Sequence, residues 1–263
     1  MSSTAVVYLL WEPSGRGHVD EFLASYREHP AGAEHELVIA ACGAPTPERE
    51  AAAREWFGDT PLRWESFAGP RIDLFTYREL IDRIPHSEFC FHNSYCRFLA
   101  DDWLAKILEQ LRRDDVGLAG PGGSYESLFK WKLYPPRIHY VLRYKPFPNP
   151  HLRTSCFSTK RSVVEQIDWP KITRKSQAWR FESGRAGLSQ QVFRLGLEAV
   201  VVGRDGVGYG RDEWFEANTF RSGGQSNLLI SDLRTDDYAG ASDEARDALA
   251  RDAWGKYDGI APA

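Results

Sequence analysis

Residues 5–43 read AVVYLLWEPSGRGHVDEFLASYREHPAGAEHELVIAACG, and this stretch indicates the fold. The apolar run Val6–Trp11 ends in the turn residues Glu12-Pro-Ser-Gly15, a pattern that is typical of a buried strand. Apolar side chains then recur at helical spacing between His18 and His29, and a second apolar run covers Glu36–Cys42. Together these segments predict a βαβ unit with parallel strands.

The same alternation continues along the chain. It predicts helices over 48–57, 74–84, 103–111, 160–167, 188–195 and 242–254, and strands over 62–67, 88–92, 116–120, 152–158 and 198–202. Asp101 or Asp102 is expected to cap the helix over 103–111. Repeated units with apolar strands predict an α/β fold, in which helices cover both faces of a mainly parallel, Rossmann-like sheet.

The composition is that of a globular protein. The chain has 263 residues, of which 42% are hydrophobic and 27% charged, and this excludes a fibrous or largely disordered protein. The length favours one domain, divided into a nucleotide-binding half (1–120), an acceptor and catalytic half (121–203) and a C-terminal tail (204–263). The net charge of −4 gives no basic face for phosphates, so nucleic acid is not an expected partner.

Compartment and redox state follow from what the sequence lacks. No apolar run approaches the roughly 18 to 20 residues of a membrane span, and the N-terminus shows no basic region of a signal peptide. Cys42, Cys90, Cys96 and Cys156 have no CxxC spacing and lie in or beside apolar stretches. We therefore expect a cytoplasmic protein whose thiols are reduced.

Four motifs stand in a recognisable order. They are Leu10-Trp-Glu-Pro13 after the first strand, Phe91-His-Asn-Ser-Tyr95 after a buried strand, Arg153-Thr-Ser-Cys-Phe-Ser158, and Glu182-Ser-Gly184 before a helix and a Val-rich strand. In the order and spacing of these motifs, the chain resembles the GT-A glycosyltransferases of family 2. The resemblance covers roughly Val6 to Val202. The resemblance implies a nucleotide-sugar donor, inverting transfer, a glycan or lipid-linked acceptor, and a role in polysaccharide or glycoconjugate synthesis.

The chain departs from the family at its carboxylates. The family's DxD motif, which holds a divalent cation against the diphosphate, stands here as Asn93-Ser94-Tyr95. The paired Glu-Asp is reduced to Glu182-Ser183, and no acidic residue follows the second strand in Ala41-Cys42-Gly43. No metal ligand is assigned, and the motif does not support Mg²⁺ or Mn²⁺ as a cofactor.

Inverting transfer requires a general base and positive charge at the leaving diphosphate. Glu182, expected at the start of a helix, is the predicted base, and a solvated capping carboxylate is the alternative. His151 is the second candidate base. The guanidinium fork suits phosphate, so Arg153, Arg211 and Arg221 are predicted donor contacts, although each alone also fits a surface ion pair.

Further donor-binding residues are expected where strands end. The strand ends at Trp11, Gly43 and Asn93 should meet at one edge of the sheet, where Asn93 and Ser94 would bind ribose or diphosphate. A strand-end turn is the alternative for both. Asp73 and Tyr77 resemble the segment of the family that contacts the nucleobase of the donor, and Asp73 also fits a helix cap. Trp11 is expected to stack on the nucleobase or to lie in the core.

The stretch 121–150 lacks regular periodicity and is rich in Gly, Pro, basic and aromatic residues, which indicates a functional loop. Trp131 and Arg137 in this loop are the predicted acceptor contacts. The loop would hold a glycan, an anionic lipid carrier or a membrane surface, and a solvated loop is the alternative.

Two other functions stay open. A sugar-phosphate nucleotidyltransferase shares the doubly wound architecture, but Pro13-Ser-Gly-Arg-Gly17 lacks its Gly-rich start with Arg and Lys. A catalytically silent GT-A module that binds a glycan or scaffolds a synthase accounts for the missing carboxylates. The oligomeric state cannot be derived from these patterns.

Overall fold

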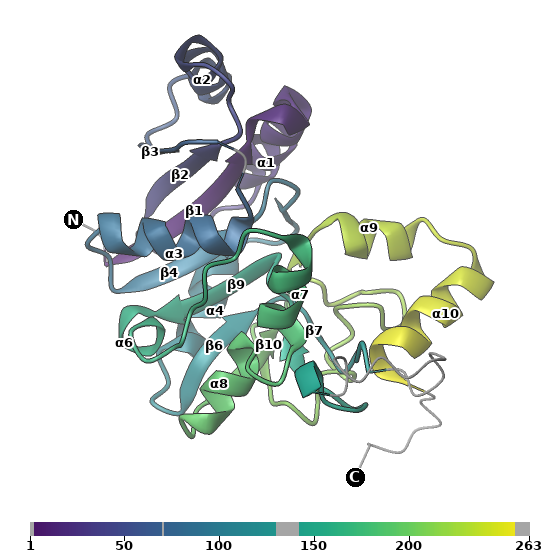
Figure 1. Ribbon diagram of the computed structural model, residues 1–263. Coiled ribbons are helices and arrows are strands. Elements are labelled where there is room, and N and C mark those ends of the chain that lie inside the picture. The colour runs from purple at the N-terminus through teal and green to yellow at the C-terminus, as the bar shows by residue number, and fades with distance from the viewer. Residues whose placement is uncertain (1–2, 70, 130–141, 256–263) are drawn as a thin grey trace.

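The computed structural model describes residues 3–69, 71–129 and 142–255, and an eight-stranded mixed sheet forms its centre (Figure 1). In spatial order its strands are β11 (Gly208–Tyr209), β10 (Glu198–Val202), β6 (Val116–Gly120), β9 (Cys156–Lys160), β4 (Glu88–His92), β1 (Thr4–Trp11), β2 (Glu36–Cys42) and β3 (Arg63–Phe67). Two short antiparallel pairs accompany it, β5 (Arg97–Phe98) with β12 (Ile230–Ser231) and β7 (Gly123–Ser124) with β8 (His151–Leu152). The predicted GT-A-like, Rossmann-like α/β architecture is confirmed.

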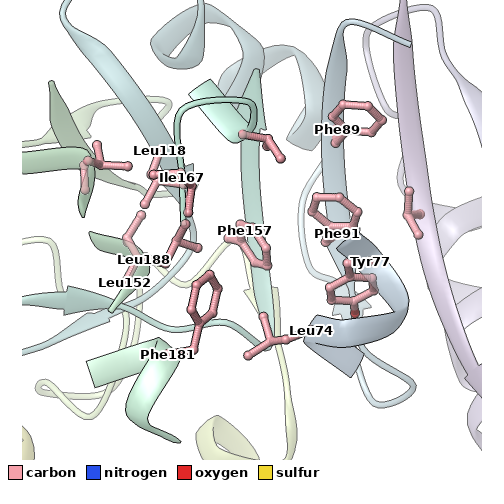
Figure 2. Packing of buried hydrophobic residues seen from close by; sticks show 14 of the residues in the cluster. Leu74, Tyr77, Phe89, Phe91, Leu118, Leu152, Phe157, Ile167, Phe181 and Leu188 are labelled. Carbon is pink, nitrogen blue, oxygen red and sulfur yellow. The ribbon is translucent and has the colours of Figure 1, made fainter. Parts of the chain in front are cut away.

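Helices cover both faces of the sheet, and each face has its own apolar cluster. One face carries α1 (Arg16–Glu28), α2 (Pro47–Arg54) and α4 (Trp103–Leu111), and the other carries α3 (Asp73–Arg83), α6 (Arg161–Val164), α7 (Lys175–Ser183) and α8 (Leu188–Arg194). Figure 2 shows Phe91 and Phe157 of the second face beside Leu74, Phe181 and Leu188 from these helices. The C-terminal helices are α9 (Leu233–Ala239) and α10 (Asp243–Trp254).

Strand β1 is paired in parallel with β2 on one side and β4 on the other. Trp11 lies opposite Cys42, and Tyr8 lies opposite His92, so the carboxyl ends of the three strands meet at one edge, as predicted. Gly43 follows β2 with a φ of +86°, and a Cβ at this position would lie 2.6 Å from the ring of Trp11. Only glycine fits this turn without displacing the indole.

The single strand predicted over 152–158 is divided in two. β9 runs antiparallel between β4 and β6, whereas β8 pairs with β7 outside the main sheet. Between them the backbone N–H of Arg153 donates to the carbonyl of Gly122, and that of Thr154 donates to the carboxylate of Glu182. The strand is interrupted because a side chain and a loop, not a neighbouring strand, receive these N–H groups.

Two helices, α7 and α9, were not predicted, and one predicted cap is wrong. The sequence of α7, KSQAWRFES, has too few apolar residues for a clear helical period. At α4, Asp102 has a left-handed φ of 59° and no side-chain cap, and Asp101 instead contacts His29. The first N–H groups of α4 are satisfied by a backbone carbonyl, that of Ala31, so no side-chain cap is needed.

The C-terminal segment is part of the main body. β12 pairs with β5, and the buried indole of Trp254 donates from Nε1 to the carbonyl of Phe220 at 2.9 Å. Its ring meets Tyr125 edge to face, with 5.0 Å between centroids. All four cysteines are free and buried. Within the described ranges, no helix is long and apolar enough to cross a bilayer.

Because Trp254 joins α10 to two other segments, we predict that Trp254→Ala lowers the free energy of unfolding by about 3–5 kcal/mol. The measurement is urea denaturation followed by circular dichroism. Trp179→Ala is the matched control, since the Trp179 side chain is 53% exposed, and its effect should stay within about 0.5 kcal/mol. Equal losses in the two variants would contradict this account of α10.

Candidate functional site

A cavity of about 340 Å³ lies between the end of α7, the loop before β12 and the two C-terminal helices. It brings together four predicted site residues, namely His151, Arg153, Glu182 and Arg221. The rest of its wall is formed by Glu126, Leu128, Trp179, Ser183, Phe220, Arg234, Leu249 and Asp252.

Glu182 lies in the last turn of α7 and not, as predicted, at the start of a helix. Its Oε1 accepts a hydrogen bond from Nη1 of Arg153 at 2.6 Å, and its Oε2 accepts from the N–H and hydroxyl of Thr154 at 2.9 and 2.5 Å. Burial favours the neutral acid, but Arg153, His151 and the Thr154 hydrogen bonds outweigh it and hold the pKa of Glu182 below its usual value. The ionised carboxylate keeps unused acceptor capacity on Oε1.

Two guanidinium groups lie against one aromatic ring in this cavity. The Cζ atoms of Arg153 and Arg221 are 5.3 and 5.1 Å from the centroid of Phe220. The Nε atoms of both arginines are buried, and among the described residues neither has a hydrogen-bond partner. Burial, the largest effect, lowers the pKa of Arg221; the carboxylates of Glu126 and Asp252 oppose this shift, whereas the charges of Arg153 and Arg234 add to it. This arrangement favours an anion that would satisfy the buried N–H groups.

Arg234 of α9 adds a third guanidinium to the wall and was not predicted. Its neighbour Asp232 caps α9, accepting hydrogen bonds from the N–H groups of Arg234 and Thr235 at 2.9 and 3.0 Å. This cap fixes where α9 begins and therefore where Arg234 stands. Asp232 is a recognisable capping residue in the sequence, but nothing there indicates which cavity the helix faces.

His151 is buried, and its Nδ1 lies 2.8 Å from the carbonyl oxygen of Asn149. A carbonyl only accepts, so Nδ1 carries the proton and Nε2 holds the lone pair of the neutral ring. Burial lowers the pKa of His151 in spite of the neighbouring Glu182 carboxylate. The ring is therefore neutral near pH 7 and able to accept a proton.

Asp73 and Tyr77, one turn apart on α3, have different surroundings. Asp73 is the first residue of the helix, and its Oδ1 accepts from the N–H of Leu74 at 2.8 Å. Burial raises the pKa of Asp73 to about 6, and Glu182 contributes to the shift, so this carboxylate is electrostatically coupled to the cavity. Tyr77 is fully buried against Phe91, with 4.5 Å between ring centroids, and belongs to the core.

The strand-end residues make internal contacts. Ser94 donates from Oγ to the carbonyl of Leu9 at 2.8 Å and accepts from the N–H of Trp11 at 3.2 Å. Oδ1 of Asn93 accepts from the N–H of Tyr95 at 3.0 Å, which forms a turn. Trp11 is half-buried beside Gly43.

These contacts bear on the divalent cation that the resemblance implies for the Asn93-Ser94-Tyr95 position. The oxygens of Asn93 and Ser94 are engaged within the protein, and neither side chain is a carboxylate, so the pair does not fit a hard cation. In residues 3–69, 71–129 and 142–255 no group of three or more His, Cys, Asp or Glu side chains is arranged to hold a metal ion.

Three predicted residues remain to be located. Arg211 is not in the wall of the cavity: the guanidinium lies 4.9 Å from the ring centroid of Phe193, and the backbone carbonyl accepts from the hydroxyl of Tyr125. The position of Arg211 in a Gly-bearing tail did not reveal that it faces α8. Trp131 and Arg137 lie outside the described residues.

Comparisons with known proteins agree with the fold. The chain is similar to the mannosyltransferase PcManGT from Pyrobaculum calidifontis, solved with GDP-Man and Mn²⁺, with a TM-score of 0.51 and 15% identity. The match covers 82% of this chain but only 60% of that one. A 4-diphosphocytidyl-2C-methyl-D-erythritol synthase from Anaerococcus prevotii matches at a TM-score of 0.44 and 11% identity, over 68% of this chain and 83% of that one. No protein-family model and no curated protein matches the sequence.

The raised pKa of Asp73 predicts a pH-dependent cost of folding. An acid whose pKa is higher in the folded state costs nothing below its unfolded pKa, near 4, and destabilises the fold as pH rises through about 6. Asp73→Asn removes this titration. The difference in the free energy of unfolding, variant minus wild type, should therefore increase by about 1–3 kcal/mol from pH 4 to pH 7.5.

Urea denaturation at both pH values tests this, with Asp82→Asn, an exposed carboxylate on the same helix, as the control. A difference that grows as the pH falls would show that the charge of Asp73 stabilises the fold.

Proposed function

We propose that the chain is a glycosyltransferase that moves a sugar from a nucleotide-sugar donor to an acceptor in polysaccharide or glycoconjugate synthesis. The observation that carries the proposal is the joint position of Glu182, Arg153 and Arg221 in one cavity beside the carboxyl edge of a GT-A-like sheet. The donor would extend from the strand ends at Trp11 and Asn93 toward this cavity. Asp73, coupled electrostatically to Glu182, would lie between the two.

Glu182 is the proposed general base. Its low pKa keeps it ionised at neutral pH, and Thr154 and Arg153 fix its orientation while Oε1 retains room for one more donor. In inverting transfer, the acceptor oxygen forms a bond to the anomeric carbon as the bond to the diphosphate breaks. The acceptor proton passes to Oε1 of Glu182.

Arginine side chains would stabilise the leaving group. The departing diphosphate gains negative charge, and Arg153, Arg221 and Arg234 provide guanidinium groups in the same cavity. The unpartnered Nε atoms of Arg153 and Arg221 would find acceptors in phosphate oxygens. This chain's own cations thus supply the positive charge, and no step depends on the strand-end residues that fail to fit a metal ion.

A catalytically silent GT-A module is the second candidate. It is favoured by the hydrogen bonds that Ser94 and Asn93 make within the chain. In the transferases that the chain resembles, the side chains at these positions face the donor. Such a module would bind a glycan or hold a synthase complex together without turning over a nucleotide sugar.

Donor binding separates these functions. We predict that at least one nucleotide sugar raises the melting temperature, because a ligand that binds only the folded state stabilises it by mass action. The measurement is a thermal-shift screen in Mn²⁺ and in EDTA, and the shift should be similar in both. A shift that EDTA abolishes and Mn²⁺ restores would reveal a missed metal site. No shift and no nucleoside diphosphate release would favour the silent module.

Two variants separate the base from the phosphate contacts. Glu182→Gln keeps one acceptor oxygen for Thr154 but replaces the other with an NH₂ group that cannot take a proton, so kcat should fall about 10²- to 10⁴-fold while donor binding through the other arginines persists. Arg221→Gln should raise the donor KM as well as lower kcat, because a phosphate contact acts in both ground and transition states. Circular dichroism confirms that each variant is folded. Near-normal turnover of Glu182→Gln would move the role of base to His151.

A further inference from the structure

Trp179 presents a large apolar surface at the wall of the catalytic cavity. Its side chain is 53% exposed, whereas Trp103, Trp214 and Trp254 are fully buried. It stands on α7 three residues before Glu182, a spacing that places both side chains on one side of the helix. Unlike an isolated exposed side chain, this indole lines a cavity together with polar and charged groups, which is the usual composition of a ligand site.

The surroundings of Trp179 define the chemistry of that ligand. Three carboxylates, those of Glu126, Glu182 and Asp252, line the same cavity, together with the aliphatic side chains of Leu128 and Leu249. Carboxylates accept hydrogen bonds from hydroxyl groups and repel phosphates. A flat aromatic ring suits the C–H face of a pyranose, so the wall around Trp179 complements a neutral, polyhydroxylated molecule.

The arginines of the cavity suit the anionic part of the ligand set. Arg153 and Arg221 flank Phe220 and are assigned to the diphosphate, and the nucleobase is expected near Trp11 at the strand ends. This leaves the Trp179 wall for the second substrate. Figure 1 shows α7 on the side of the sheet that faces α9 and α10, whose residues Arg234, Leu249 and Asp252 complete the cavity.

We propose that Trp179 is the stacking platform for the acceptor, and that the acceptor is a saccharide whose nucleophilic hydroxyl points toward Glu182. The inference rests on the proposed transferase function and adds the substrate class. A lipid or peptide acceptor would not require an indole and three carboxylates in one cavity wall.

The test uses the full chain and a panel of methyl pyranosides as probes. Saturation-transfer NMR measures direct binding, and nucleoside diphosphate release from the nucleotide sugar found by the thermal-shift screen measures turnover. In Trp179→Ala, the ratio of the glycoside KM to the donor KM should rise about tenfold, and the NMR signal of the bound glycoside should weaken in parallel. Trp179→Phe should restore most of both. Leu195→Ala, an exposed apolar residue outside the cavity, is the control.

The outcomes keep the two proposals apart. If the protein turns over the donor but Trp179→Ala leaves the glycoside KM unchanged, the stacking platform is wrong and the transferase function stands. The same holds if the donor is turned over but the wild type binds no glycoside. Glycoside binding that Trp179→Ala abolishes, without any donor turnover, supports the saccharide site and overturns the transferase. Turnover stimulated by a lipid phosphate or a peptide, but by no glycoside, also overturns the platform.

Discussion

The buried contact between Glu182 and the segment Arg153-Thr154 is the constraint on which the site depends. It joins the last turn of α7 to the segment between β8 and β9, and it orients Arg153, whose guanidinium lies over Phe220 of the C-terminal tail. Both side chains are largely removed from solvent, so each charge is compensated mainly by the other. Three distant parts of the sequence are therefore positioned by one carboxylate, which couples the shape of the cavity to the charge that acts in it.

The central strands could be predicted from the sequence because burial on both faces makes them continuous apolar runs. β2, β4, β6 and β10 have the predicted bounds for this reason. The prediction failed where polar contacts decide the backbone. The run 152–158 contains a polar interruption whose N–H groups bind Gly122 and Glu182, and α7 is specified by its packing and its polar contacts more than by an apolar period.

The residues that line the cavity could be predicted in part, and their role as a site stays a prediction. Glu182, His151, Arg153 and Arg221 were selected because the chemistry needs a base and cations near polar turns, and the fold places all four in one cavity. Arg211 satisfied the same criterion but faces Phe193, and Arg234 satisfied no motif but faces the cavity. In a tail without regular periodicity, residue type and order along the chain do not define the direction of a side chain. That direction is set by how the tail packs on the sheet.

The position of β9 has a consequence for how the protein is made. β9 lies between β4 and β6, although it leaves the ribosome after both of them. Until it emerges, β4 is paired only with β1, and β6 has no partner in the main sheet because β10 also follows it in the chain. Open strand edges of nascent chains are prone to pair wrongly. Trp254 emerges later still, close to the last described residue. The strand ends are therefore synthesised long before the walls of the cavity. Chaperones that delay the pairing of β4 and β6 until late in translation should raise the yield of correctly assembled protein.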